Sequence, residues 1–146
     1  MSKKKIETGA KGLEELKDEL VKRGYEVTIV SQTNKGFDAI CRSPKKKTFR
    51  VEAKTSTSLT QLPIQPHHVE GKLQDNLFYV FVRSVSDENK HVPNGFYFFT
   101  HEEVKAAWIL MPRINLKNGQ PYDPKWKSLD WCLLRLHRDR WYKIPE

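Results

Sequence analysis

Residues 77–85, LFYVFVRSV, are the part of this sequence that most restricts its fold. The run is almost continuously apolar and lacks the alternation of a strand that has one face in water. Runs of this kind are typical of strands buried on both faces, inside a sheet that is covered on both sides. The sequence therefore predicts an internal strand at 77–85 and an α/β domain around it.

Helices are expected on either side of this strand in the sequence. Leucine side chains recur at helical spacing at 13, 16 and 20, which predicts a helix over 9–23 that ends at Gly24. The tetrapeptide at 100–103, Thr-His-Glu-Glu, matches a capping box, so a second helix should begin there and run to about Trp108. We also expect a short helix at 68–74.

Four more segments have the β-branched and aromatic content of strands: 25–31, 37–42, 48–55 and 95–100. Residues 56–68 and 111–126 are expected to be irregular, and 129–137 fits either a helix or a strand. The order of helix, three strands, a helical piece, two strands and more helix fits an α/β domain with a mixed sheet.

The length of 146 residues predicts a single domain over 1–146, with residues 1–8 as a flexible basic tail. No apolar run approaches the roughly 18 residues that cross a bilayer, so no membrane association is expected. The N-terminus lacks the apolar core of a secretory signal, and the cytoplasm is therefore the expected compartment. Cys41 and Cys132 belong to no Cys-x-x-Cys pair, which argues against a zinc knuckle or a disulfide framework.

Charged residues interrupt two of the predicted strands: Asp38 in 37–42, and Glu52 with Lys54 in 48–55. A hairpin that is symmetric about Lys45 places Asp38 opposite Glu52, with Cβ atoms roughly 5 Å apart. Because side chains alternate along a strand, Glu52 and Lys54 share one face. Buried unpaired charges are costly, so these three residues need partners, and a salt-bridged patch on a solvated sheet face is the simplest arrangement.

Two facing carboxylates can instead hold a hard cation such as Mg²⁺, which prefers oxygen ligands. A lysine beside the metal can stabilise negative charge that develops on a phosphate, and the metal can activate a water. The net charge of +8, from 26 Lys and Arg against 18 Asp and Glu, favours a polyanionic partner. The pattern predicts metal-assisted hydrolysis of phosphodiester bonds in nucleic acid.

Asp38 followed by Glu52-x-Lys54 on adjacent strands, after an N-terminal helix, resembles the PD-(D/E)XK or restriction-endonuclease-like nuclease superfamily. Residues 13–56 are similar to the core of archaeal Holliday-junction resolvases and of small uncharacterised bacterial members, and the runs DNLFYVFV and FYFFT extend the resemblance. The resemblance implies a mixed central sheet flanked by helices and a deoxyribonuclease that binds Mg²⁺ or Mn²⁺ through Asp38 and Glu52. Lys54 would assist catalysis, and DNA would be the substrate.

The sequence departs from the superfamily at two positions. Phe37 stands where many members have proline. Many members also carry a glutamate on the first helix, and the corresponding position here is Leu13. Glu14 is the nearest acid that could replace it as a catalytic residue, although it lies about 100° further around the helix. A solvated helix residue is the alternative role for Glu14.

Several other polar residues are candidates for contact with nucleic acid. Lys45, Lys46 and Lys47 could contact phosphate or simply be solvated at a hairpin tip. Thr55 and Ser56 could bind phosphate or fill capping and turn roles. Tryptophan and arginine residues crowd the C-terminal region, where they could stack on bases or pack over the sheet. His91, His101 and His137 are isolated in the sequence.

Two other functions stay open from the sequence. One is a non-catalytic nucleic-acid-binding or protein-interaction module on the same fold, which the leucine at position 13 favours. The other is a basic protein that pairs with an acidic protein and contacts no nucleic acid. A homodimer is also possible, since the apolar run 95–100 could form an exposed sheet edge.

Overall fold

The computed structural model describes residues 3–30, 36–55, 61–64, 71–85, 93–110, 127–130 and 134–146. Within these ranges the helices are α1 (Lys3–Lys22) and α2 (His101–Leu110). The strands are β1 (Glu26–Ile29), β2 (Ala39–Arg42), β3 (Thr48–Thr55), β4 (Gln61–Ile64), β5 (Leu77–Arg83), β6 (Gly95–Thr100) and β7 (Lys127–Asp130). Two short 3-10 helices follow, η2 (Arg135–His137) and η3 (Trp141–Lys143).

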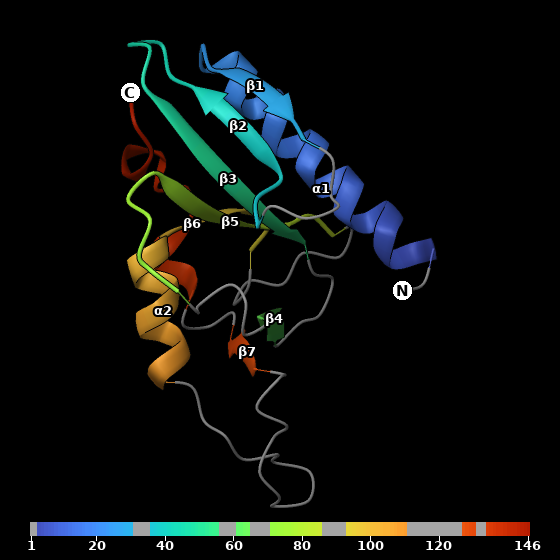
Figure 1. The fold of residues 1–146 in the computed structure, drawn as a ribbon. Helices are drawn as coiled ribbons and strands as arrows, with labels where there is room; N and C mark the ends of the chain where they lie inside the picture. The colour runs from blue at the N-terminus through green and yellow to red at the C-terminus, as the bar shows by residue number, and fades with distance from the viewer. Residues whose placement is uncertain are drawn as a thin grey trace, which may run out of the picture.

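Five strands form the central sheet in the order β1-β2-β3-β5-β6 (Figure 1). Only the β3–β5 pair is parallel, so the sheet is mixed, as expected. Every residue of β5 is buried, which confirms the internal strand predicted from the apolar run, although the strand ends at Arg83 rather than at Val85. β4 and β7 form a separate antiparallel pair.

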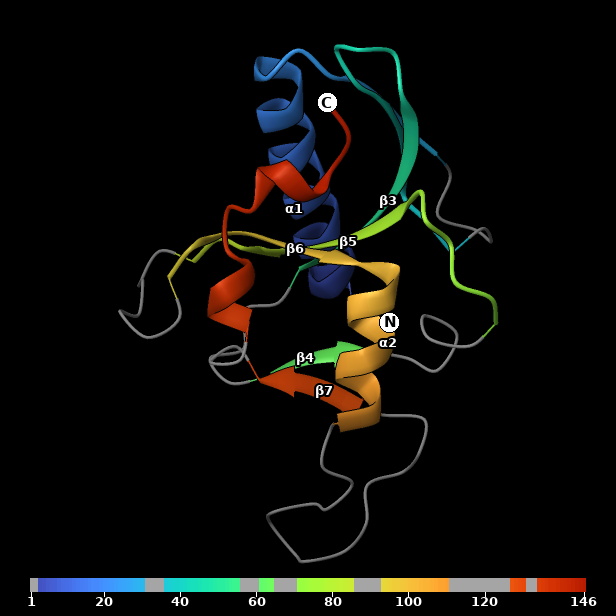
Figure 2. The same ribbon diagram turned by 90° about the vertical axis from the view of Figure 1, so that its left-hand side faces the viewer.

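Helices cover the sheet from both sides. Figure 2 shows α1 and η3 on one side of β5 and β6, and α2 with the β4–β7 pair on the other. On the α1 side, the leucines of the helix pack against buried residues of the sheet, among them Cys41, Phe49, Val51, Val80 and Phe98. On the α2 side, the core contains Leu77, Tyr79, Phe81, Tyr97, Phe99, Val104 and Leu134.

Helix α1 follows the leucine spacing but begins earlier than expected. Leu13, Leu16 and Leu20 are each at most 6% exposed, which confirms the predicted buried stripe. The helix starts at Lys3, so residues 3–8 are helical rather than the flexible tail that the sequence suggested. It ends at Lys22, and Gly24, whose φ of +89° suits glycine, turns the chain so that the Tyr25 amide donates to the Leu20 carbonyl.

Three other expectations need correction. Residues 61–64, expected to be irregular, form β4, and Pro63 is tolerated because this strand belongs to a two-stranded pair with an open edge. Residues 71–74, expected at the end of a short helix, are not helical. The segment expected as either helix or strand at 129–137 contains the end of β7 and then η2. Residues 111–126 lie outside the described ranges.

Neither helix in the described part of the chain combines the length and the apolar character that a membrane span requires.

Candidate active site

The β2–β3 hairpin has the register that the symmetric turn predicts. Ser43 and Lys47 close the turn, with the Ser43 amide donating to the Lys47 carbonyl at 2.8 Å. Lys46 lies within this turn and has a φ of +68°. Arg50 lies opposite Ile40, and Val51 lies opposite Ala39. The ladder ends at this last pair, so Asp38 stands at the point where the two strands separate.

Asp38 is tied to the strand that carries Glu52. Its amide donates to the carbonyl of Val51 at 2.8 Å. Its carboxylate Oδ2 accepts a hydrogen bond from the amide of Ala53 at 2.7 Å. The Asp38 carboxylate is thus held against the backbone of the residue that follows Glu52.

Glu52 and Lys54 point to the same face of the sheet, as expected from strand alternation. The Lys54 ammonium lies 3.1 Å from Glu52 Oε1, and the two side chains are 31% and 9% exposed. This ion pair is therefore partly buried, unlike the solvated patch that was the simplest reading of these charges. On the far side of β3, Phe49 and Val51 enter the core beneath α1.

Tyr79 borders Glu52 on the side of β5. The two residues are partners in the parallel β3–β5 pair. Burial raises the pKa of the Tyr79 hydroxyl, and the Glu52 carboxylate raises it further. The phenol therefore keeps its proton and can act as a hydrogen-bond donor at this end of the sheet.

The donor set at this position suits a hard divalent cation. Asp38 and Glu52 offer carboxylate oxygens, and Mg²⁺ is commonly held by one or two carboxylates with water and substrate oxygens completing its octahedron. Among the described residues, no group of three or more His, Cys, Asp or Glu side chains forms a larger metal site. The residues present fit a metal that shares its coordination shell with a substrate.

Among the α1 side chains that the structure describes, from residue 9 onward, no acid is buried next to this pair. Leu13, at the position where many superfamily members have glutamate, is a core residue, and Glu14 is exposed. The helix instead approaches β3 through Gly12. A Cβ on Gly12 would lie 2.0 Å from Thr55 Oγ1, so only glycine permits this approach.

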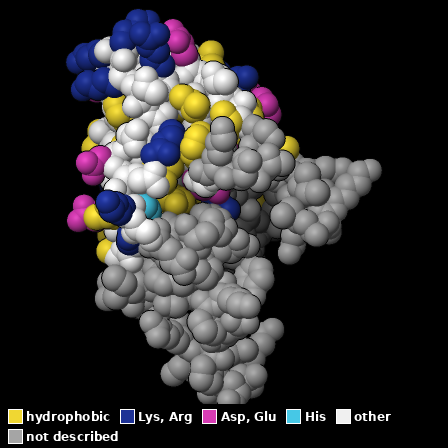
Figure 3. Space-filling view, in the orientation of Figure 1, with side chains coloured by type: hydrophobic (Ala, Val, Ile, Leu, Met, Phe, Trp, Pro, Cys, Tyr) yellow, Lys and Arg dark blue, Asp and Glu magenta, His cyan; other side chains and the backbone are white. Residues whose placement is uncertain are grey.

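The predicted phosphate-contacting residues fall in different places. Lys45, Lys46 and Lys47 are exposed at the hairpin tip, roughly 17 Å along β3 from Glu52. Figure 3 shows Lys and Arg side chains gathered over this tip, and two of them lie near acids, Lys45 with Glu146 and Lys46 with Glu26, both at 3.6 Å. Thr55 Oγ1 is buried against α1. Ser56 lies outside the described residues.

His101 was overlooked by sequence reasoning as an isolated histidine. It is 3% exposed, its Nδ1 accepts a hydrogen bond from the Gln74 amide at 3.0 Å, and its ring centroid lies 5.9 Å from that of Tyr79. The capping box at 100–103 could have indicated this, because it places His101 in the first turn of α2. His101 and Tyr79 connect α2 to the strand beside Glu52.

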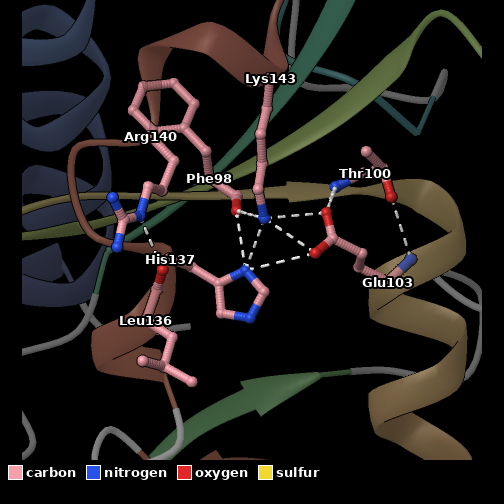
Figure 4. A network of polar contacts seen from close by, with 7 residues as sticks. All are labelled: Phe98, Thr100, Glu103, Leu136, His137, Arg140 and Lys143. Atoms are coloured by element: carbon pink, nitrogen blue, oxygen red, sulfur yellow. Dashed lines mark hydrogen bonds and ion pairs between the residues drawn. The ribbon is translucent and has the colours of Figure 1, made fainter.

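A second polar cluster joins α2 to the C-terminal segment (Figure 4). Lys143 Nζ donates to both carboxylate oxygens of Glu103, at 3.0 and 2.8 Å, and lies 2.8 Å from His137 Nδ1. Lys143 Nζ also donates to the Phe98 carbonyl at 3.3 Å. The imidazole of His137 stacks on Phe99 with 3.9 Å between centroids. These contacts of Lys143 join α2, β6 and the C-terminal segment, so the cluster has a structural role.

No family model and no curated protein matches this sequence. Among solved structures, the chain matches Hjc, a Holliday junction resolvase from the archaeal hyperthermophile Archaeoglobus fulgidus. The match covers 88% of this chain and 88% of Hjc, with a TM-score of 0.53 and 15% sequence identity. A likeness at this identity concerns the fold, and it confirms the expected class: the protein has an α/β, restriction-endonuclease-like fold with a mixed central sheet flanked by helices.

Proposed function

We propose that this protein is a nuclease that hydrolyses phosphodiester bonds in DNA with the help of Mg²⁺ or Mn²⁺. The observation that supports this most is the partly buried ion pair between Glu52 and Lys54, at 3.1 Å, beside a carboxylate of Asp38 that the Ala53 amide holds in place. Two carboxylates and a lysine in this position have the chemistry that metal-assisted phosphodiester hydrolysis requires. The resolvase-like fold and the net charge of +8 agree with it.

Each residue would have a distinct part in the reaction. Asp38 and Glu52 would hold the cation, which when bound supplies a water of lowered pKa and an electrostatic clamp on the phosphate oxygens. Lys54 would donate to a phosphate oxygen or to the attacking water and stabilise charge that appears in the transition state. The Ala53 amide keeps the Asp38 carboxylate oriented, so the site needs little reorganisation.

A non-catalytic DNA-binding module on the same fold is the second candidate. It is favoured by Leu13, a buried apolar residue at the position where many superfamily members have a glutamate. A protein that had lost this acid would keep its affinity for nucleic acid and lose turnover.

Cleavage assays separate the two candidates. Wild-type protein is incubated with linear duplex, single-stranded and four-way-junction DNA in Mg²⁺, in Mn²⁺ and in EDTA. Under the nuclease proposal at least one substrate is cut in the presence of metal, and Lys54→Ala lowers the rate on the order of 100- to 1000-fold. DNA affinity should change little, because Lys54 is one of 26 Lys and Arg residues.

The matched control is Lys22→Ala, which removes the same charge from an exposed position at the end of α1. It should cut at the wild-type rate. Binding without cleavage in either metal would reject the nuclease and support the module. Equal cleavage by Lys54→Ala and Lys22→Ala would place the chemistry elsewhere in the molecule.

A further inference from the structure

In the part of the chain that the structure describes, one half of the central sheet is covered by a helix on a single side. Helix α1 packs on the inner face of β1, β2 and β3, whereas the core beneath α2 is built from β5 and β6. The outer face of the first three strands is therefore accessible, and Ile40 on it is 39% exposed. We call this surface the open sheet face; it consists of Glu26, Thr28, Ile40, Arg42, Thr48 and Arg50.

The open sheet face leads directly to the candidate active site. Side chains on one face of β3 recur at every second residue, so Arg50, Glu52 and Lys54 follow one another on the same side. Arg50 lies about 7 Å from Glu52 along β3. Arg42 pairs with Thr48 and therefore lies about 13 Å from Glu52 in the same direction. The face thus runs from the catalytic candidates toward the basic hairpin tip.

Arg50 is held in a defined orientation on this face. Its Nη2 donates to the side-chain oxygens of Gln74 and Asn76, the latter at 3.0 Å. Its guanidinium carbon lies 5.1 Å from the centroid of Phe37. A guanidinium has three further N–H donors, on Nε and Nη1, in a planar fork that matches phosphate oxygens. Its cross-strand neighbour is the apolar Ile40 rather than an acid.

The charges of this surface are predominantly positive. Arg42 and Arg50 lie on the open sheet face, and Lys46 stands at its outer end. Glu26 is the acid among the residues of the face, and its carboxylate lies 3.6 Å from the Lys46 ammonium. Thr28 and Thr48 add hydroxyl groups, which commonly contact phosphate oxygens. The composition fits an extended polyanion better than a protein surface.

We propose that the open sheet face binds the sugar–phosphate backbone of one DNA strand, with Arg50 and Arg42 each contacting a phosphate. This inference rests on the proposed function, because it places the bound strand so that it continues into the site at Glu52 and Lys54. Arg50, about 7 Å from Glu52, would anchor a phosphate close to the reacting one, and Arg42, about 13 Å away, would contact a phosphate farther along the same strand.

The test compares two double variants that lose the same charge. Arg42→Gln/Arg50→Gln removes both arginines from the open sheet face. Lys11→Gln/Lys22→Gln removes two exposed lysines from α1, on the opposite side of the sheet. Binding of a short fluorescent duplex DNA is measured by anisotropy in EDTA, over a series of NaCl concentrations. Thermal unfolding establishes that the variants are folded. The single variant Arg42→Gln, at an exposed position, is measured in the same way as an independent test of one arginine.

The arginine double variant should bind at least about tenfold more weakly, and the slope of log affinity against log salt should fall by about 1.8, or about 0.9 per lost contact. Arg42→Gln alone should lower the slope by about 0.9. The lysine double variant should keep the wild-type slope. If both double variants lose the same DNA affinity, the loss reflects the total charge of the protein rather than contacts of the two arginines, and the inference is overturned. A wild-type salt slope for the arginine double variant would overturn it as well.

Because EDTA excludes metal-dependent cleavage, this outcome is independent of turnover. Wild-type protein that binds with the predicted slopes but never cuts DNA would overturn the nuclease and support the binding face. Wild-type protein that cuts DNA while the arginine double variant binds normally would overturn the binding face alone.

Discussion

At the scale of single residues, Asp38 combines a structural contact with a proposed catalytic one. Its carboxylate accepts the Ala53 amide at 2.7 Å and would also bind the metal. Substitution can separate these roles. Asp38→Asn keeps a side-chain oxygen that can accept from Ala53 but loses the negative charge, so we expect near-wild-type stability and loss of metal-dependent cleavage. Asp38→Ala loses both, and should also lower the free energy of unfolding by about 1–3 kcal/mol.

Urea unfolding and cleavage assays on the two variants check this separation. If Asp38→Asn is destabilised as much as Asp38→Ala, the charge itself supports the fold, and the loss of activity could not be attributed to metal binding. If Asp38→Asn cuts DNA normally, Asp38 is not a metal ligand.

The register at this site could be predicted from the sequence, because the turn 43–47 is symmetric and side chains alternate between the two faces of each strand. The contacts around the site could not be predicted. The bond from Ala53 to Asp38 forms where the ladder ends, and pairing rules do not describe such points. Arg50 is oriented by Gln74 and Asn76, which lie more than twenty residues away in the chain. His101 gave no periodic signal of its contact with Tyr79.

At the scale of elements, the contact of α1 with β3 depends on Gly12. In an ordinary helix, replacing glycine with alanine stabilises by up to about 1 kcal/mol. Here the new Cβ would meet Thr55 Oγ1 at 2.0 Å, so Gly12→Ala should destabilise by about 1–3 kcal/mol in urea unfolding. Gly9→Ala is the matched control in the same helix: apart from the backbone of the helix itself and the two neighbouring residues, nothing lies within 4 Å of a Cβ at this position, and the usual gain is expected.

A double variant shows whether the clash is the cause. Thr55→Ala removes the closest atom, so it should restore part of the stability lost in Gly12→Ala, and the two effects should not be additive. A stabilised Gly12→Ala would mean that α1 can move away from β3, which would also loosen the strand that carries Glu52 and Lys54.

The C-terminal segment closes the outer edge of the sheet, which the sequence did not indicate. The Asp139 amide donates to the Phe96 carbonyl at 2.7 Å, Lys143 Nζ donates to the Phe98 carbonyl, and Arg138 forms a bridge with Tyr97. Residues 95–100 form an edge strand, as expected, but these groups occupy its outward acceptors. A homodimer, if it forms, would have to displace this segment to pair strands there. These groups lie in or between the short 3-10 helices η2 and η3, which have no periodicity from which to predict them.

At the scale of the whole molecule, burial patterns predicted more than local propensity did. The unbroken run in β5 and the leucine stripe of α1 were sufficient to predict an internal strand and the buried face of the first helix, because each pattern records which residues lie in the core. β4 and β7 could not be predicted, since residues 61–64 and 127–130 carry a proline, charges and few β-branched side chains. Their pairing depends on long-range contact, which leaves no local pattern.

The cluster of Glu103, His137 and Lys143 makes the stability of the whole molecule sensitive to acid. Burial and the Lys143 ammonium lower the pKa of His137, whose Nδ1 lies 2.8 Å from Lys143 Nζ and 3.2 Å from the Phe98 carbonyl oxygen. Burial alone would raise the pKa of Glu103, but hydrogen bonds from Lys143 and from the Thr100 amide lower it on balance. Arg140 adds a smaller effect in the same direction on His137.

Both shifts have the same consequence for folding. A group whose pKa is lower in the folded state binds protons more readily once unfolded, so stability is present above its ordinary pKa and is lost as the pH falls below it. For His137 this loss begins below 6.5, and for Glu103 below 4.5. We therefore expect the free energy of urea unfolding to decline in two stages on acidification, as the ring and then the carboxylate take up protons and release Lys143.

Two variants assign the stages. His137→Gln keeps a polar side chain beside Lys143 but does not titrate, so its free energy of unfolding should stay level between pH 6.5 and pH 4.5, where that of the wild type declines. Glu103→Gln should lack the decline below 4.5, and the double variant should lack both contributions. If His137→Gln and the wild type lose stability in parallel between pH 6.5 and pH 4.5, groups other than His137 cause that loss. The C-terminal segment would then be fastened to α2 by the Lys143–Glu103 pair alone, because the imidazole would contribute packing on Phe99 and no proton-linked stability.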